Sequence, residues 1–430
     1  MITLNKDQLR FWFPSLESAL RDLAREHERA LLPRLLAEDR EPTVRKLRAR
    51  FGLRGVHDHK VGRAERLIRE ANADQISSVV ERLCERAVSQ YLHNELNIGF
   101  QRTLRIPDST KTYPLPAGLG YFPLRDVDDY AERLPETWLE RGGVLMPMYQ
   151  SEALWINFST SYPYVIKIAA GKINAVTGTL WDEGLTAKPQ NYLVVPEQPW
   201  LDGFAVSKGI IRQFVAMPLG TGYSIEEQVT GKAEVGGLQL QVFPMRAESY
   251  FERLIERRMP HKFDDLVDEL TKDLLPRERM QRCFSPAMSM PYVCEDRVEG
   301  MALAAGGRMR QEIYADPYSV EDWDLTRSHR CFVHICNSMQ WRQITGTNPP
   351  HPPLTASEYQ RYGVPWFDHY RDDLNALDGS SILDSAKSIS QIDATKGDKV
   401  LTQNYDLHPE LIVQTGNNRR PSNEIREWAL

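Results

Sequence analysis

Residues 191–246 constrain the fold of this chain more than any other stretch. They run NYLVVPEQPWLDGFAVSKGIIRQFVAMPLGTGYSIEEQVTGKAEVGGLQLQVFPMR, in which short β-branched and aromatic runs alternate with glycine turns. This pattern predicts strands at 192–195, 210–217, 224–230 and 238–243. Similar runs predict strands at 96–106, 144–148, 154–158, 165–170, 308–314 and 331–335. Short strands at this density favour a β-sandwich or jelly-roll-like module over residues 96–346.

The flanking segments have a different period. Leucines recur at helical spacing in residues 16–36, and apolar residues continue this pattern to residue 88, which predicts a helical domain over residues 1–95. The charged segment 247–282 has a helical period and is expected to be an insertion that packs on the sheet. Proline-rich residues 347–353 then begin a wrapping tail over residues 347–430, with short helices in YGVPWFDHY and SNEIREWAL. The expected fold class is therefore α+β.

Composition narrows the class of protein. No run of about 18 apolar residues occurs, so no transmembrane helix is expected, and the N-terminus lacks a secretory signal pattern. The five cysteines (Cys84, Cys283, Cys294, Cys331 and Cys336) are scattered and form no Cys-x-x-Cys pair. Reduced thiols in a cytoplasmic protein are the expectation.

The charge is uneven along the chain. Residues 40–70 hold ten Lys and Arg against four Asp and Glu, within a formal net charge of −6 for the chain. Such a cluster either binds an acidic partner or forms a solvated helical face; with few aromatic residues interleaved, the second reading is favoured and nucleic acid is not expected. His57-Asp58-His59 is the only metal-like group and lacks a third ligand, so no metal site is predicted.

Three strands place a charged or ionisable residue on an apolar face. Arg102 lies between Phe100 and Leu104, Glu227 follows Ile225, and His334 lies between Phe332 and Cys336. Since an unpaired buried charge is costly, such a group must be paired or functional. One reading is an Arg102–Glu227 ion pair under the sheet. The other is a concave pocket in which Glu227 or His334 acts as acid or base.

Three further groups carry polar side chains that suit a ligand. Arg212 and Gln213 are adjacent in a strand, so one of them faces inward; a buried Arg212 suits a carboxylate or phosphate, and an exposed edge strand is the alternative. The loop 196–203 holds Glu197, Gln198, Trp200 and Asp202, which suits a sugar or another polar ring unless the tryptophan only plugs the end of a sandwich. Glycines precede Arg308 and Arg310, which favours an anion contact weakly.

Eight phrases within residues 98–378 occur in an order that resembles a family of uncharacterised proteins from bacteria and fungi. They are QRTLRIPD, PLPAGLGYFPL, ERGGVLMPMYQSEALWINF, VVPEQPWLDG, RQFVAMPLGTGYSIEEQVTG, GGLQ, GGRMRQEIYADPY and GVPWFDHY. The resemblance implies that this region is one module with a variable front end, which here is helical. It implies no catalytic role for any residue.

Two hypotheses of function follow. Because no recognised catalytic motif occurs, the first is a binding or effector module for a polar small molecule or a protein segment, of a kind used in defence systems. The second is a hydrolytic enzyme that uses Glu227 with Asp202 or His334, with Arg212 or Arg308 holding an anionic group. The sequence indicates neither a cofactor nor an oligomeric state.

Overall fold

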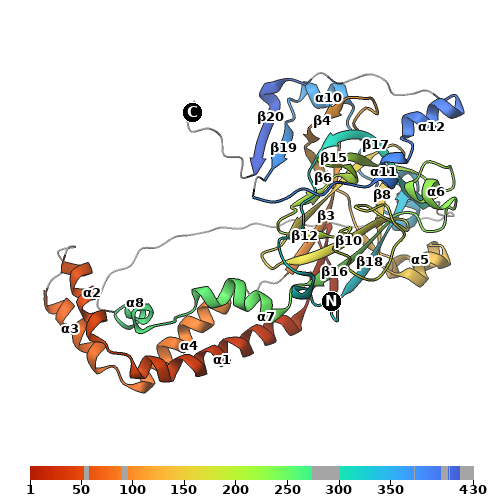
Figure 1. Ribbon diagram of the computed structural model, residues 1–430. Helices are drawn as coiled ribbons and strands as arrows, with labels where there is room; N and C mark the ends of the chain where they lie inside the picture. The colour runs from red at the N-terminus through yellow and green to blue at the C-terminus, as the bar shows by residue number, and fades with distance from the viewer. Residues whose placement is uncertain are drawn as a thin grey trace. The chain divides into compact units, whose positions relative to one another are not determined.

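The fold is α+β: four N-terminal helices are followed by a large antiparallel sheet that does not close into a barrel (Figure 1). This computed structural model describes residues 1–52, 58–89, 95–273, 300–371, 373–398, 405 and 407–416. The chain forms two compact units. We call them the β unit (Met1–Trp12, Glu95–Met245 and the described residues from 300 onward) and the helical unit (the described residues of 13–94 and 246–289).

The helical unit combines two separate parts of the sequence. Its elements are α1 (Pro14–Ala37), α2 (Glu41–Gly52), α3 (Asp58–Glu70), α4 (Ala73–Ser89), α7 (Ala247–Tyr250), η2 (Phe251–Ile255), η3 (Glu256–Arg258), η4 (Phe263–Leu266) and α8 (Val267–Leu270). Leu16, Leu20, Leu31 and Leu35 form the buried face of α1, as their spacing predicts.

The charged segment after residue 246, expected as an insertion in the β module, belongs to the helical unit. The amide of Phe263 donates to Glu38 Oε2 at 2.9 Å, and His27 Nε2 lies 3.2 Å from the carbonyl oxygen of Pro260. These contacts join residues more than 200 positions apart, and the spacing of apolar residues along the sequence does not predict such partners. Residues 274–282 of the predicted insertion lie outside the described residues.

The first twelve residues form a hairpin rather than a helix, which corrects the prediction for the start of the chain. Strand β1 (Ile2–Asn5) pairs with β2 (Gln8–Trp12), and β2 pairs antiparallel with β3 (Glu95–Thr103). Leu9 and Phe11 are fully buried, while the neighbours of Leu9 are only partly buried. This alternation of period two is present in the sequence, and the β3 partner makes it a strand.

Seventeen strands of the described chain form one hydrogen-bonded sheet. Besides β1–β3 its strands are β4 (Thr112–Tyr113), β6 (Gly118–Tyr121), β7 (Arg125–Asp126), β8 (Val144–Met148), β9 (Ala153–Ser159), β10 (Tyr164–Ala170), β11 (Ile173–Asn174), β12 (Leu193–Val195), β13 (Trp200–Leu201), β14 (Gly203–Ser207), β15 (Ile210–Pro218), β16 (Leu238–Pro244), β17 (Gly300–Arg310) and β18 (His329–Asn337). The order β1-β2-β3-β9-β15-β17 continues through a short β17–β18 pairing to β18-β16-β10-β12, and β8 lies on β18.

The second, smaller sheet has the order β20-β19-β5, from β5 (Leu115–Pro116), β19 (Trp366–Tyr370) and β20 (Ile412–Gly416). The remaining helical elements of the β unit connect or flank the two sheets. They are η1 (Asp128–Arg133), α5 (Glu136–Arg141), α6 (Ile225–Thr230), η5 (Val320–Asp322), α9 (Ser338–Thr345), α10 (Ala356–Arg361), α11 (Ser381–Ser385), α12 (Ile389–Lys396) and η6 (Pro409–Leu411).

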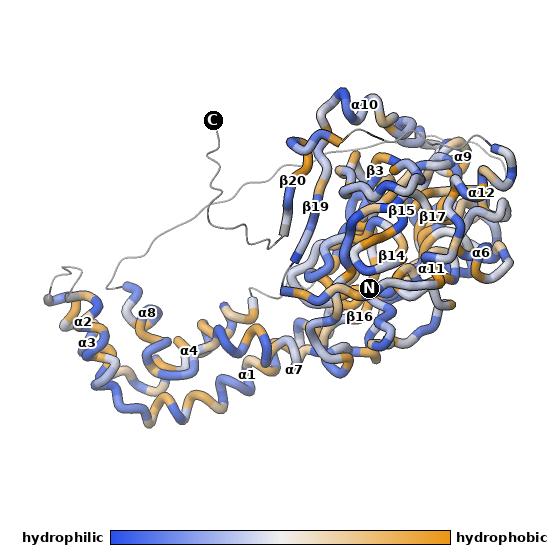
Figure 2. The backbone as a smooth tube through the Cα atoms, turned by 45° about the horizontal axis from the view of Figure 1, so that its top comes forward, coloured by the Kyte–Doolittle hydropathy of each residue, from blue (hydrophilic) through white to orange (hydrophobic). Residues whose placement is uncertain are grey.

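Most of the predicted strands are confirmed, and two predictions are wrong. Residues 224–230 contain α6, and the strand expected at 308–314 is β17, which ends at Arg310. Alanines and glycines make up much of β17, and these residues have low strand propensity, so the pattern missed it. Strands β10 and β16 are buried at every position, which requires cover on both faces. Figure 2 shows hydrophobic residues gathered among the strands inside the β unit.

Segments after residue 346 belong to the β unit and pack against its earlier strands. The amide of Ser380 donates to the carbonyl of Ala205 at 2.9 Å, and Ile389 and Ile392 join a buried cluster with Tyr223. YGVPWFDHY contains strand β19, so the short helix expected there is wrong. SNEIREWAL lies outside the described residues.

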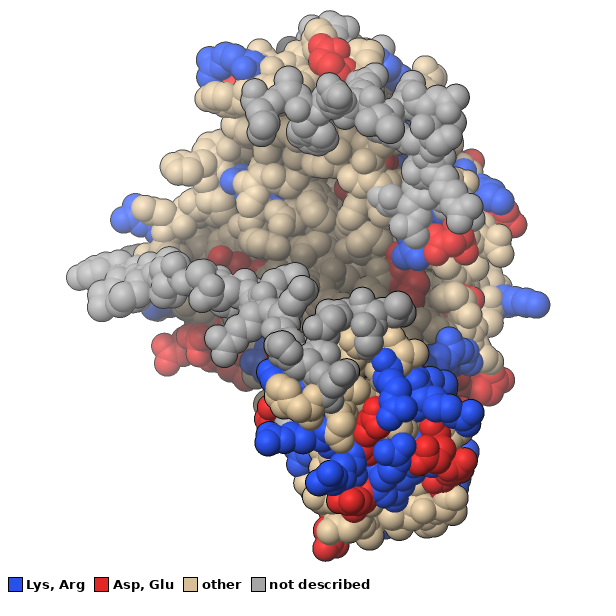
Figure 3. All heavy atoms as spheres, turned by 90° about the vertical axis from the view of Figure 1, so that its left-hand side faces the viewer, with Lys and Arg blue, Asp and Glu red and all other residues tan. Residues whose placement is uncertain are grey.

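Four cations of the basic cluster of residues 40–70, Lys46, Arg48, Arg50 and Arg69, form ion pairs within the helical unit. Arg48 binds Glu65 through two hydrogen bonds of 2.8 and 2.6 Å, and Arg69 Nε lies 2.7 Å from Glu41 Oε1. Figure 3 shows Lys and Arg interspersed with Asp and Glu on the end of this unit that carries α2 and α3. The pairing reduces the positive charge that this face offers to a partner. His57 and Asp58 have no described side chains.

The described residues bear on two expectations from composition, one about transmembrane helices and one about the cysteines. No helix in that part of the chain combines the length and the apolar character that crossing a membrane requires. Cys84, Cys331 and Cys336 are free and buried, and burial raises the pKa of each thiol to about 12. Such thiols are poor nucleophiles and serve as small packing residues.

Candidate ligand pocket

Glu227 lies in the first turn of α6 and caps that helix. Ser224 Oγ accepts a hydrogen bond from the Glu227 amide at 3.1 Å, and Glu227 Oε2 accepts one from the Ser224 amide at 3.2 Å. Glu227 Oε1 also accepts from the Gly222 amide at 2.8 Å. This is a capping box, and its sequence signal, Ser-x-x-Glu, is present at Ser224. The sequence pattern placed Glu227 on the inward face of a strand, which indicated a pairing or functional role. Because residues 225–230 form a helix, that reason for a functional role no longer holds.

Replacing Glu227 with Ala is expected to lower the free energy of unfolding by about 1–2 kcal/mol, because three backbone and hydroxyl donors near the start of α6 lose their acceptor. Glu227→Gln should cost less, since the amide oxygen still accepts in a capping box. Urea denaturation of both variants measures the difference. An unchanged free energy in Glu227→Ala contradicts the capping role.

Arg102 pairs with Glu152, not with Glu227, so the predicted Arg102–Glu227 ion pair is wrong. Arg102 Nε donates to Glu152 Oε1 at 2.7 Å, and Nη2 donates to the carbonyl of His351 at 2.6 Å. The side chains of Arg102 and Glu152 are 13% and 1% exposed. Arg102 is thus the paired residue that the structural alternative required; it is partly buried, and its buried partner Glu152 lies 50 positions along the chain.

His334 is buried on β18 and stacks on Trp138, with 4.8 Å between the ring centroids. Its Nε2 lies 2.9 Å from the carbonyl oxygen of Gly142, so this nitrogen carries the proton and donates. Burial lowers the pKa of His334 to about 4, so the ring is neutral at pH 7. In the described contacts, His334, Glu227 and Asp202 share no hydrogen-bond partner.

The three predicted ligand-binding arginines, Arg212, Arg308 and Arg310, lie on neighbouring strands. Arg212 and Arg308 are cross-strand neighbours on β15 and β17. Arg212 Nη1 lies 3.7 Å from Asp108 Oδ1, and burial lowers the pKa of its guanidinium.

Arg308 and Arg310 contact carboxylates of the tail. Arg308 lies 3.5 Å from Asp384, and Arg310 binds both oxygens of Asp368 at 2.9 and 3.0 Å. With Asp108 beside Arg212, carboxylates of this chain occupy the positions that an anionic ligand would take.

The loop 196–203 divides into supporting and pocket-lining residues. The Gln198 amide donates to the carbonyls of Trp200 and Glu312 at 3.1 and 3.2 Å, and its oxygen accepts from the Tyr314 amide at 3.1 Å. Glu197 Oε1 accepts from the Tyr318 hydroxyl at 2.8 Å. Gln198 and Glu197 therefore hold the loop in place, and Trp200 and Asp202 line a cavity.

This cavity has a volume of about 540 Å³, which is in the usual range for small-molecule sites. It lies where the small sheet meets β9 and β13 of the large sheet. The lining residues are Leu115, Pro116, Ala117, Gly118, Trp155, Pro199, Trp200, Asp202, Phe367, His369 and Thr415. We call it the aromatic pocket.

Three aromatic rings follow one another along the wall of the aromatic pocket. The ring centroids of Trp155 and Trp200 are 6.1 Å apart at an interplanar angle of 65°, and those of Trp200 and His369 are 4.7 Å apart at 54°. Trp155 and His369 were not among the predicted site residues. Their signal is aromatic and polar residues side by side in ALWINF and WFDHY, and only the tertiary structure brings both segments to one cavity.

Asp202 is the buried acid of the aromatic pocket. It is 2% exposed, and its Oδ2 accepts a hydrogen bond of 3.0 Å from Gln311 Nε2. The Gln311 oxygen accepts from the Asp202 amide at 3.0 Å, which fixes the orientation of the glutamine. Burial raises the pKa of Asp202 to about 8, so the group is mainly protonated at pH 7. Because Oδ2 accepts from Gln311, the proton belongs on Oδ1.

Two other polar atoms at the wall of the aromatic pocket have no hydrogen-bond partner among the described residues. They are Trp155 Nε1 and His369 Nε2, both shielded from solvent. His369 Nδ1 lies 3.1 Å from Thr415 Oγ1, and burial with the nearby Arg371 lowers the pKa of the His369 ring. Unsatisfied buried polar atoms carry an energetic cost that a ligand with matching groups would relieve.

The described residues contain no group of three His, Cys, Asp or Glu side chains placed to hold a metal ion. Comparison of the chain with models of protein families, with curated proteins and with solved structures found no match. The function is therefore inferred from the geometry of the site.

Proposed function

We propose that the β unit is a binding module for a neutral, ring-shaped small molecule with hydrogen-bonding groups at its edge. One observation carries the proposal: the aromatic pocket combines two tryptophans and a histidine with a protonated Asp202. Aromatic faces stack on the apolar face of a sugar or a heterocycle, and a few placed polar groups orient it.

The charge of the wall supports a neutral ligand. None of the described lining residues is Lys or Arg, and both Asp202 and His369 are uncharged at pH 7. A charged ligand would lose its hydration without gaining a counter-charge, which is costly. A protonated Asp202 donates a hydrogen bond, and Trp155 Nε1 is a second donor. The ligand is therefore expected to present acceptors such as hydroxyl or carbonyl oxygens.

Binding is favoured over the hydrolytic alternative. Glu227 and His334 do not line the aromatic pocket, and both make structural contacts elsewhere. Among the described lining residues, Asp202 is the one carboxyl group, whereas glycoside hydrolysis ordinarily needs two.

We also propose a sandwich or jelly-roll arrangement of the strands and a cytoplasmic location. The strand sets β1-β2-β3-β9-β15-β17 and β8-β18-β16-β10-β12 are joined through β17–β18, an arrangement that suits two sheets packed as a sandwich or jelly roll. A cytoplasmic location suits the three free, buried thiols.

The test is a titration of the whole chain with neutral monosaccharides and nucleosides, followed by saturation-transfer NMR. Trp200→Ala is expected to weaken binding by about tenfold or more, because a central aromatic contact is lost. Trp155→Phe should weaken it by about fivefold, because the ring remains but the Nε1 donor is lost.

Trp181→Phe is the matched control, since Trp181 lines a different cavity. It is expected to bind these neutral compounds like the wild type. If no compound in either class binds, or if Trp200→Ala binds as well as the wild type, the proposal fails.

A further inference from the structure

A second cavity of the β unit has the opposite character to the aromatic pocket. Its volume is about 720 Å³, and it shares no lining residue with the aromatic pocket. Its lining residues are Arg141, Lys172, Leu180, Trp181, Val229, Thr230, Lys232, Glu234, Val235, Gln239, Arg330 and Phe332. Four of these side chains are cationic and one is a carboxylate, so the described wall has a positive excess. We call it the basic pocket.

Arg330 is held in a fixed orientation in the wall of the basic pocket. Its guanidinium carbon lies 5.1 Å from the ring centroid of Trp181 and 4.9 Å from that of Phe332. Arg330 Nη2 donates to Gln239 Oε1 at 2.5 Å. Its contact with Glu183 is loose, at 3.6 Å, and the Glu183 side chain is 81% exposed. A guanidinium fixed by rings and weakly neutralised is prepared to bind an anion.

A buried lysine also contacts the Trp181 ring. The Lys167 side chain is fully buried on β10, and its Nζ lies 5.1 Å from the centroid of the Trp181 ring. Lys167 Nζ donates to the Asp182 carbonyl at 2.8 Å and also to the Asp182 carboxylate and the Gly184 carbonyl.

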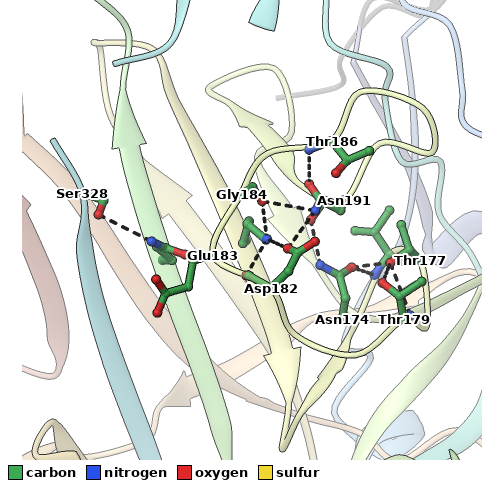
Figure 4. Close-up of polar contacts among 12 residues, drawn as sticks. Asn174, Thr177, Thr179, Asp182, Glu183, Gly184, Thr186, Asn191 and Ser328 are labelled. Atoms are coloured by element: carbon green, nitrogen blue, oxygen red, sulfur yellow. Dashed lines mark hydrogen bonds and ion pairs between the residues drawn. The ribbon is translucent and has the colours of Figure 1, made fainter. Parts of the chain in front are cut away.

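Asn191 reinforces the same loop. Figure 4 shows Asp182, Gly184 and Asn191 converging, and the Asn191 amide donates to both of the others at 3.3 Å. The loop that carries Trp181 is therefore fixed before any ligand binds, which lowers the entropic cost of binding.

The remaining cations are only partly neutralised. Glu234 forms ion pairs with Lys172 and with Lys232, the second at 3.5 Å, so one carboxylate serves two lysines. Arg141 Nη2 donates to the carbonyl of Glu234 at 3.4 Å rather than to a carboxylate. The half-exposed Lys172 and the exposed Lys232 keep charge available at the mouth of the cavity.

We propose that the basic pocket binds a small organic phosphate whose body is aromatic or apolar. Arg330 and Lys172 supply donors for the phosphate oxygens, which bind guanidinium and ammonium groups strongly. Trp181, Leu180 and Val229 supply apolar surface for the body. Within the part of the chain that the structure describes, Trp181 Nε1 is buried without a hydrogen-bond partner, and it is a further donor at this wall. The chemistry differs from the neutral ligand proposed for the aromatic pocket, so the two proposals are independent.

The experiment is calorimetric titration of the whole chain with phenyl phosphate and inorganic phosphate at low ionic strength. Phenyl phosphate is expected to bind more tightly than inorganic phosphate, because the cavity has both a charged and an apolar part. Arg330→Gln and Lys172→Gln should each weaken phenyl phosphate by about tenfold or more, since a charge-assisted hydrogen bond is lost. Glu234→Gln should strengthen binding, because a like charge is removed.

The controls separate this site from general charge effects and from the aromatic pocket. Arg25→Gln removes an exposed cation of the helical unit and should leave phenyl phosphate binding unchanged. Trp200→Ala should also leave it unchanged. Circular dichroism checks that each variant is folded. Absence of phenyl phosphate binding to the wild type overturns the proposal. Phenyl phosphate binding to Arg330→Gln and Lys172→Gln that is as tight as to the wild type also overturns it. So does weaker phenyl phosphate binding to Glu234→Gln than to the wild type.

Discussion

Raising the pH from about 4 to about 8 is expected to lower the free energy of unfolding by on the order of 5 kcal/mol through Asp202 alone. Burial raises the pKa of Asp202 from 3.8 to about 8 in the folded protein. Below the unfolded value both states are protonated and the contribution is fully present. Between the two values the unfolded chain ionises while the folded protein keeps its proton, so stability falls with each pH unit. Above the folded value the loss is complete.

Asp202→Asn isolates this effect from all other titrations. The amide is neutral at every pH, and its oxygen still accepts from Gln311 Nε2. The variant and the wild type should have similar stability near pH 4, and the variant should be more stable near pH 8. Urea denaturation at both pH values measures the difference. Asp22→Asn, in an exposed pair with Arg25, should show no such divergence. Parallel pH profiles for Asp202→Asn and the wild type would show that Asp202 titrates normally.

Replacing Arg102 with Met is expected to lower the free energy of unfolding by about 3–5 kcal/mol, because Glu152 would remain buried without its counter-charge. Burial raises the pKa of Glu152 and Arg102 lowers it, so the variant should raise that pKa further. The cost should therefore shrink as the pH falls and Glu152 takes up a proton. Denaturant unfolding at pH 7 and at pH 5 measures both effects.

A double variant and a surface variant complete this test. Arg102→Met with Glu152→Met should recover much of the lost stability, since apolar residues replace both partners. Arg25→Met removes an exposed cation whose partner Asp22 is also exposed, and should change stability by less than about 1 kcal/mol. A loss for Arg102→Met no larger than that for Arg25→Met would contradict the role of the buried pair.

Local patterns predicted the secondary structure well where one period dominated. Alternation identified β3, apolar runs bounded by turn residues identified β8 and β16, and the leucine spacing identified α1. The pattern failed at α6, where isoleucine and valine resemble a strand, although Ser224 and Glu227 form a capping box that can be read from the sequence. It also failed at β17, where small residues hide a strand that only its partner β15 reveals.

In the candidate site, too, some residues could be predicted from a local pattern and others could not. Trp200 and Asp202 were predicted from one loop, and both line the aromatic pocket. Trp155 and His369 complete the wall from β9 and β19, segments that no local rule connects. The loop also contained Gln198, which resembles a ligand contact in sequence but binds three backbone groups in the fold.

By itself, the sequence determined which residues face inward where a single local period dominated, as in α1 and β3, because that orientation depends on a period of 2.0 or 3.6 residues. Only the tertiary structure decided what each inward group meets. Arg102 faces inward as predicted, yet its partner is Glu152 on the β8–β9 turn rather than Glu227, because strand pairing brings β9 beside β3. Burial, and with it the raised pKa of Asp202, likewise depends on chain segments far apart in sequence, since desolvation is a property of everything packed around a group.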